Sequence, residues 1–296
     1  MSIVLGVDIG GSHITTALVD LNTRKLITDS KKRRWVDSGA EAQQICNEWF
    51  ELMEAILKEN GDSAVQIGIA IPGPFNYEEG ISLMQEQGKF KHLYGLNIKN
   101  LLAQRLGTDA AAIRFMNDAA CFLQGEVFTG AAKDYRRVFG LTLGTGLGSA
   151  MCVDGKAYDA DLWKSPFKEG MAEDYLSTRW FVKRYQELSG ETIAGVKELL
   201  EEGNGDLIEI IFGEFTQNLA SFLVPNINKL QPAAIVFGGN ISNASARFFP
   251  ALQALLKEQQ MDVEIYQSLL NEDASLIGAA SCWTSFEERV AIAAAV

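Results

Sequence analysis

The sequence predicts an α/β protein built from two similar halves. Strand-like and helix-like segments alternate along its 296 residues, which favours a mixed α/β fold over an all-α or all-β one. The stretch "FGLTLGTGLGSAMCVDGK" overlays the N-terminal stretch "LGVDIGGSHITTALVDLN" without gaps. The overlay places Gly140 on Gly6, Gly144 on Gly10, Val153 on Val19 and Asp154 on Asp20. This recurrence indicates an internal duplication, with a chance likeness between two glycine hairpins as the alternative.

The first half begins with strands and continues as alternating helices and strands. A short apolar strand at Ile3–Val7 precedes a second strand in "HITTALVDL" and a third in "KLITDSKK". Between residues 40 and 60, apolar side chains recur at a spacing that marks one face of an amphipathic helix. The later segments that we expect are a central strand at 64–71, a helix near 98–106, a strand at 113–116 and a helix from 118 to about 128.

The second half is mostly helical after Tyr175. Its later strands are expected in "AAIVFGG" and near 263–266, and a last helix begins near Asp273. We expect an N-terminal domain over 1–117, joined by the C-terminal helix at 276–292, and a larger domain over 118–275. No linker is visible, so we expect the halves to pack around a cleft.

Composition narrows the class of protein. The net charge is −12 with a pI near 4.8, which argues against a nucleic-acid partner. The basic run 31–34 is expected to be a solvated loop or strand end. The four cysteines are scattered, with no C-x-x-C or C-x-C pair, so we expect reduced core thiols. We see no signal peptide and no apolar stretch of bilayer length, so we expect a cytoplasmic protein without membrane partners.

Three glycine turns follow predicted strands. They are Gly10-Gly11, Gly144-Thr145-Gly146-Leu147-Gly148 and Gly238-Gly239. Glycine lets backbone N–H groups approach an anion closely and allows positive φ, so such turns can cradle phosphates. Each alone is more often a plain turn, but together they favour a nucleotide site.

The common nucleotide motifs do not account for these turns. The sequence contains no G-x-x-x-x-G-K-[ST] motif, and Ser149 replaces the third glycine of G-x-G-x-x-G. A strand rather than a helix follows each of the first two turns. Glycine hairpins followed by strands are typical of the two phosphate loops of actin-like (ribonuclease H-like) ATPases.

Six motifs in order resemble those of the ROK family of sugar kinases and repressors, within the actin-like ATPase and hexokinase superfamily. They are "LGVDIGGSHI", "GIAIPGP", "NDAACFLQGE", "TLGTGLGSAMCVDGK", "AIVFGGNIS" and "DASLIGAA", and they run from Leu5 to Ala280. The resemblance implies a two-domain actin-like fold with duplicated halves. It also implies an ATP-dependent transferase of carbohydrate metabolism, and it suggests a homodimer.

The resemblance assigns Asp118 as the base that accepts the proton of the sugar hydroxyl, with Asn117 as a sugar contact. Because Asp118 would open a helix, the macrodipole favours its ionised form, although a helix N-cap is the plain alternative. Pro72-Gly73 would border the sugar. Asp8 would help to hold Mg²⁺ through a water molecule or a phosphate. The residues implied for ATP are Gly10, Gly11, Ser12, Gly144, Thr145, Gly146, Gly238, Gly239 and Asn240.

The sequence departs from the family where many members carry E-x-G-H and a cysteine-rich zinc segment. Here that stretch reads "DADLWKSPFKEGMAEDYLS", without cysteine or histidine, so we expect no structural zinc. Glu173 takes the place of the family's second sugar-contacting glutamate. Asp161 and Lys164 occupy the E and H places, with an exposed loop pair as the equal alternative. The change puts glucokinase-like specificity in doubt.

Two functions are consistent with these motifs and with the departure from the family pattern. The first is a kinase that transfers the γ-phosphate of ATP to a hexose or hexose derivative. The alternative is a catalytically inactive sugar- or nucleotide-binding protein of the same fold. A DNA-binding repressor is disfavoured by the acidic charge and by a first strand that starts at Ile3. His13 and His92 are not assigned to the site.

Overall fold

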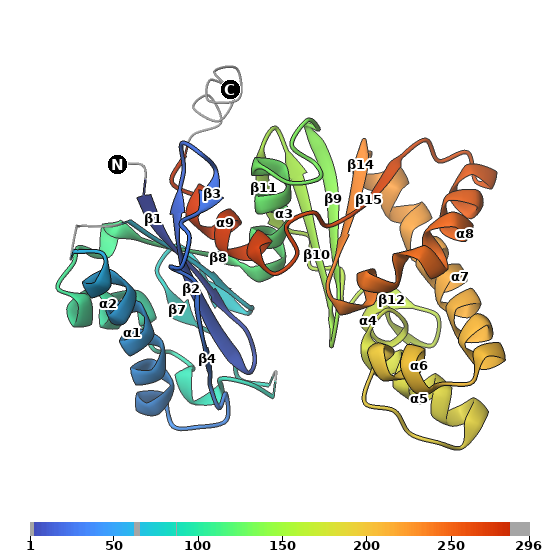
Figure 1. Ribbon diagram of the computed structural model, residues 1–296, viewed down its shortest axis with the longest axis horizontal. Helices are drawn as coiled ribbons and strands as arrows, with labels where there is room; N and C mark the ends of the chain where they lie inside the picture. Colours follow the sequence, from blue (N-terminus) through green and yellow to red (C-terminus); the bar gives the residue numbers. More distant parts are fainter. Residues whose placement is uncertain (1–2, 62–65, 87, 285–296) are drawn as a thin grey trace. The chain divides into compact units, whose positions relative to one another are not determined.

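The structure is a computed structural model that describes residues 3–61, 66–86 and 88–284 (Figure 1). The chain divides into two compact units, one formed within 1–129 and 272–296 and the other within 130–271. The sequence placed this boundary between residues 117 and 118. In the structure the boundary lies after residue 129, because the helix that starts at Asp118 packs on the helix that starts at Asp273. The part of the expected helix 276–292 beyond residue 284 lies outside the described residues.

The first unit is a mixed sheet with helices on both faces. Its sheet has the order β3-β2-β1-β5-β8, and β4 also pairs with β2. The elements are β1 (Ile3–Ile9), β2 (His13–Asp20), β3 (Lys25–Leu26), β4 (Lys32–Trp35), α1 (Ala42–Glu59), β5 (Gln66–Ile71), β6 (Phe75–Asn76), β7 (Ile81–Ser82), α2 (Ile98–Leu106), β8 (Ile113–Asn117), α3 (Asp118–Phe128) and α9 (Asp273–Ser281). Short 3₁₀ turns lie at Lys91–Leu93 and Ala110–Ala112.

Alternation along β1 separates the two faces of this sheet. Leu5, Val7 and Ile9 join the apolar core that α1 covers, which confirms the amphipathic helix. Gly6 faces α9, where a β-carbon would lie 2.4 Å from the Leu276 carbonyl oxygen. The glycine therefore lets the helix backbone approach the strand directly.

The expected third strand is interrupted. Asp29 takes a positive φ of 62°, so the chain turns between β3 and β4, and both strands pair with β2. The basic run becomes the edge strand β4, with residues that alternate between exposed and half-buried. The side chains of the basic run 31–34, of which Lys31 precedes β4, form surface ion pairs with Asp273, Glu59, Glu272, Glu48 and Glu51.

The second unit repeats the sheet of the first. Its order is β11-β10-β9-β14-β15, with β14 parallel to β9 as β5 is to β1. The elements are β9 (Arg137–Leu143), β10 (Leu147–Val153), β11 (Lys156–Asp159), β12 (Pro166–Phe167), β13 (Gly170–Met171), α4 (Ala172–Tyr175), α5 (Thr178–Ser189), α6 (Val196–Glu202), α7 (Gly205–Leu230), β14 (Ala234–Gly238), α8 (Ser245–Glu258) and β15 (Glu264–Gln267). A 3₁₀ turn covers Asn240–Ala244.

The repeat corrects the gapless overlay at one position. β1 and β9 share one burial pattern, and Ile14–Asp20 and β10 share another. Ile9 pairs with Ile14 across four residues, whereas Leu143 pairs with Leu147 across three. The second turn is therefore one residue shorter, and Val153 corresponds to Asp20 rather than to Val19.

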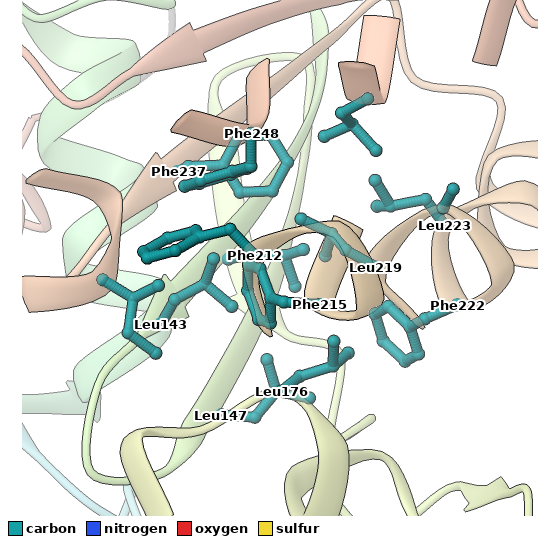
Figure 2. Close-up of a cluster of buried hydrophobic side chains, with 14 of the residues drawn as sticks. Leu143, Leu147, Leu176, Phe212, Phe215, Leu219, Phe222, Leu223, Phe237 and Phe248 are labelled. Carbon is teal, nitrogen blue, oxygen red and sulfur yellow. The ribbon is translucent and has the colours of Figure 1, made fainter. Parts of the chain in front are cut away.

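Helix α7 forms the centre of the core of the second unit. Figure 2 shows Phe212, Phe215 and Leu219 of this helix among side chains from the sheet and from α8. Among the described residues, α7 alone is long and apolar enough to cross a membrane. Of its most apolar stretch, 56% is buried in this core, so packing within the unit accounts for the apolar character of the helix.

Candidate active site

The candidate residues of the first unit gather where three neighbouring parallel strands end. Strand register places Asp8 opposite Ala70 and Ile71 opposite Asn117. The ends of β1, β5 and β8 therefore meet at one edge of the sheet, which is where open α/β sheets bind ligands. Asp8, Pro72 and Asp118 thus share one edge, although the successive positions are 64 and 46 residues apart in the sequence.

Asp8 is the electrostatically unusual member of this group. It precedes the last residue of β1, on the α9 face, and is half-buried. Part of its surface is accessible, yet its carboxyl group lies deep enough for desolvation to dominate. Burial, and then the charge of Asp118, raises the pKa of Asp8 from 3.8 to about 7, although Arg33 and Lys31 act in the opposite direction. A carboxylate held at such a cost is typical of a functional position.

Asn117 and Asp118 have different roles at the start of α3. Asn117 is the N-cap, and its Oδ1 accepts the N–H of Ala120 at 3.0 Å. Asp118 is thereby relieved of the capping role, and its Oδ1 accepts only the adjacent N–H of Ala119 at 2.9 Å. The plain N-cap interpretation of Asp118 is therefore wrong. The Nδ2 group of Asn117 has two N–H donors, of which one is used by Tyr77, so the other is available to a sugar hydroxyl.

The Pro72-Gly73 segment follows β5 directly. Gly73 would carry a β-carbon 3.1 Å from the hydroxyl oxygen of Tyr77. This hydroxyl also lies 3.3 Å from Nδ2 of Asn117, which donates to it. Tyr77 therefore links the proline-glycine segment to the N-terminus of α3. Tyr77 was not predicted as a site residue, although an aromatic residue close to a Pro-Gly-Pro turn was a usable signal.

The first glycine turn is held from both sides. The N–H of Gly10 donates to the His13 carbonyl at 2.8 Å, and the N–H of Val36 donates to the Ser12 carbonyl at 2.9 Å. Ser12 Oγ lies 2.9 Å from Nδ1 of His13. Neither Gly10 nor Gly11 has a positive φ, and a β-carbon on either would make ordinary contacts at 3.5–3.6 Å, so neither backbone conformation nor crowding requires glycine at these positions.

The second glycine turn is closed by Glu173. The N–H of Leu147 donates to Oε2 of Glu173 at 2.9 Å, and Arg179 pairs with Oε1. A β-carbon on Gly146 would lie 2.5 Å from Oε2. Both carboxylate oxygens of Glu173 are therefore engaged within the unit, one of them in fixing the turn. Arg179 was not predicted as a site residue; its side chain is 65% exposed and reaches this turn through its ion pair with Glu173.

The third glycine turn lies beside the second. Gly238 pairs with Thr142 of β9, and Oδ1 of Asn240 lies 3.7 Å from where a β-carbon on Gly144 would be. Gly239 has a φ of 84°, and a β-carbon there would meet the Leu143 carbonyl oxygen at 2.3 Å. This is the one expected glycine site that needs positive φ.

Asp161 and Lys164 pair with each other on the surface. Their charged atoms lie 2.6 Å apart, and their side chains are 48% and 58% exposed. This is the exposed loop pair that was the alternative to a sugar contact. The described residues contain no group of three or more His, Cys, Asp or Glu side chains arranged to hold a metal ion.

A cavity of about 1000 Å³ lies within the second unit, next to Glu173. Trp163, Arg179 and Trp180 contribute to its wall. The candidate residues thus form two groups, one in each unit, and each group surrounds at least one glycine turn.

Comparison with known proteins connects both groups to one family. The model of the ROK family matches residues 4–160 and 168–285. An N-acetyl-D-glucosamine kinase of Mannheimia succiniciproducens is 25% identical over 293 residues, covering 88% of this chain and 91% of the relative. The N-acetylgalactosamine kinase AgaK of Shewanella sp. is 27% identical over 267 residues, covering 80% and 81%.

A solved structure extends the likeness to three dimensions. A ROK family glucokinase from Streptomyces griseus, in complex with glucose and AMPPNP, matches with a TM-score of 0.74. The identity is 19%, and the match covers 95% of this chain and 98% of that one. The match confirms the expected fold class, a two-domain actin-like ATPase fold with duplicated halves.

Proposed function

Because the chain belongs to the ROK family, we propose that it is an ATP-dependent sugar kinase that transfers the γ-phosphate to a hydroxyl group of a hexose or hexose derivative. The observation that carries this proposal is the common edge of β1, β5 and β8. There the carboxylates of Asp8 and Asp118 lie near each other beside a glycine turn. Relatives named as sugar kinases, each matched over at least 80% of this chain, support the reaction class.

The residues present fit a magnesium nucleotide. Mg²⁺ prefers oxygen ligands and is usually held by one or two carboxylates together with phosphates and water. Asp8 supplies one such oxygen group, and the cost of its burial falls when a cation is near. The N–H groups of Gly11 and Ser12 are not used by the backbone hydrogen bonds that fix the turn, so they can face phosphate. The bound metal would neutralise charge on the phosphates.

In the second unit we assign Gly144, Thr145 and Gly146 to the phosphates, and Gly238, Gly239 and Asn240 to the nucleoside side. Glu173 holds the 144–146 turn through the N–H of Leu147. Glu173 therefore positions that turn, and its carboxylate could contact a sugar only by displacing Arg179. The ion pair between Asp161 and Lys164 is left outside the proposed binding set.

We assign Asp118 as the group that accepts the proton of the sugar hydroxyl. Asn117 performs the capping of α3, so the second oxygen of Asp118 remains available to a ligand. Phosphoryl transfer has a loose transition state in which the hydroxyl proton leaves late, so position matters more than basicity. Nδ2 of Asn117 and the Pro72-Gly73 backbone would orient the sugar ring.

The substitution Asp118→Asn tests this assignment. We expect turnover to fall by about 10²- to 10⁴-fold, the usual contribution of a general base, with sugar binding retained. Asp109→Asn is a matched control, because Asp109 caps an exposed 3₁₀ turn in the same unit and loses the same charge. Full activity in Asp118→Asn would exclude the assignment.

The sugar itself is identified by measuring ADP release with Mg·ATP over a panel of sugars. The panel contains glucose, mannose, fructose, N-acetylglucosamine, N-acetylgalactosamine and N-acetylmannosamine. The names of the two relatives make the N-acetylhexosamines the first compounds to test. Absence of turnover with every sugar, while ATP and a sugar still bind, would replace the kinase with the inactive binding protein. Light scattering on the same sample tests the expected homodimer.

A further inference from the structure

The proposed phosphate site of the first unit lacks a cation in its expected residue set. The set consists of Asp8, Gly10, Gly11 and Ser12, which carry one acidic group and no basic one. Lys31 and Arg33 lower the pKa of Asp8, but each of them already forms an ion pair, Lys31 with Asp273 and Arg33 with Glu272. Within this set, no unpaired basic side chain is therefore present to accompany Mg²⁺ at the terminal phosphate of a nucleotide.

Lys89 lies against this turn. Its Cδ atom is 3.5 Å from the position that a β-carbon on Gly11 would occupy. Lys89 is half-buried, and its ammonium group makes no ion pair or hydrogen bond within the part of the chain that the structure describes. The structure therefore places a lysine stem on the glycine turn, with an ammonium group that has no protein partner among the described residues.

The position of Lys89 is fixed by the next residue. Phe90 is fully buried, and its ring meets that of Trp49 edge-to-face at a centroid distance of 5.2 Å. The N–H of Phe90 donates to the Ser38 carbonyl at 2.8 Å. Ser38 follows shortly after Val36, whose N–H holds Ser12. The backbone at Lys89 and the glycine turn are therefore anchored to the same short segment.

We propose that Lys89 binds the terminal phosphate of the nucleotide held by the turn at residues 10–12. This inference rests on the proposed kinase function and adds a residue to its binding set. A lysine ammonium is a compact point charge suited to phosphate oxygens. Negative charge is spread over the equatorial oxygens of the transferred group in the transition state, so Lys89 also promotes transfer.

Binding measurements with three variants test the proposal. Lys89→Met keeps the length of the stem and removes the charge, whereas Lys89→Arg keeps the charge. Lys91→Met is the matched control, because Lys91 is exposed and lies two residues away. Calorimetry with Mg·AMPPNP and with Mg·ADP separates the terminal phosphate from the rest of the nucleotide, and thermal unfolding checks that each variant is folded.

We expect Lys89→Met to weaken Mg·AMPPNP binding by about 10-fold or more, the effect of losing one charge-assisted hydrogen bond. Mg·ADP binding stays within about 2-fold of the wild type, Lys89→Arg restores most of the affinity, and Lys91→Met changes neither ligand. With an active sugar, KM for ATP rises while KM for the sugar is unchanged.

Three results would overturn the proposal. Wild-type affinity of Lys89→Met for Mg·AMPPNP would show that the charge is not used. Equal weakening of Mg·AMPPNP and Mg·ADP, or a rise only in the sugar KM, would place Lys89 away from the terminal phosphate. Failure of the wild-type protein to bind Mg·AMPPNP would instead overturn the proposed function, and this inference with it.

Discussion

Replacing Asp8 with asparagine should stabilise the metal-free protein while abolishing its activity. Burial and the charge of Asp118 raise the pKa of Asp8 from 3.8 to about 7. The folded protein therefore prefers the protonated acid, and ionisation of Asp8 opposes folding. This group contributes its full stability below pH 3.8 and loses it as the pH rises through about 7.

The magnitude follows from the two pKa values. At pH 9 both states are ionised, and the difference of about three pKa units corresponds to about 4 kcal/mol against folding. At pH 5 the folded state is protonated and the unfolded state is mostly ionised, so the cost is about 2 kcal/mol. An asparagine carries no such cost, so the advantage of Asp8→Asn should grow by about 2–3 kcal/mol between these pH values.

The assay is urea unfolding of the wild type and of Asp8→Asn in EDTA at pH 5 and at pH 9. Asp109→Asn, which removes an exposed carboxylate of the same unit, serves as the control and should show little pH-dependent difference. An Asp8→Asn advantage that is equal at the two pH values would refute the reasoning, as would a loss of stability at pH 9. Added Mg·ATP should reduce the advantage, because only the wild type keeps the carboxylate.

Three further changes test the packing and the site. Asn117→Ala should cost about 1 kcal/mol through loss of the α3 cap, whereas Asn117→Ser should keep most of that stability and still raise the sugar KM through loss of the Nδ2 group, measured by unfolding and by kinetics. If both variants keep the wild-type KM, Asn117 does not contact the sugar. Gly278→Ala should destabilise by about 1–3 kcal/mol, because its β-carbon would overlap a carbonyl of α3, whereas Gly213→Ala on open helix surface should stabilise by up to about 1 kcal/mol. Equal melting temperatures for these two variants would contradict the packing. Asp161→Asn and Lys164→Met should each change stability by less than about 1 kcal/mol and leave the sugar KM unchanged, and a several-fold rise would return the pair to the binding set.

The order of the elements was predictable because periodicity and glycine turns are local signals. The α1 face, the central strand β5 and the helix that starts at Asp118 all followed from spacing and end signals. The difference of one residue in length between the two glycine turns was not predictable. A gapless overlay aligns the glycines whether or not the two turns have the same length. Only strand register reveals it.

The site was predicted less completely than the fold. Asp8 stood out because a glycine turn at the end of an apolar strand does not need a carboxylate, and Asp118 stood out through the resemblance of its segment to a family motif. Lys89, Tyr77 and Arg179 did not, because each reaches its position through contacts with residues distant in sequence. The engagement of Glu173 with Leu147 was equally invisible, since it depends on how a helix start meets a turn.

The position of α9 in the chain has a consequence for synthesis. This helix covers one face of β1 and β5, where Gly6 and Gly68 lie against its backbone carbonyl oxygens. In the sequence, however, the helix comes after the whole of residues 130–271. During translation, the first sheet therefore emerges with one face uncovered and must wait for some 140 further residues before its cover arrives. At ordinary elongation rates that interval lasts about 7–30 s, long enough for a chaperone to bind the exposed strands. The nascent chain is thus most vulnerable to aggregation at its earliest-made domain, and that domain is the last to be completed.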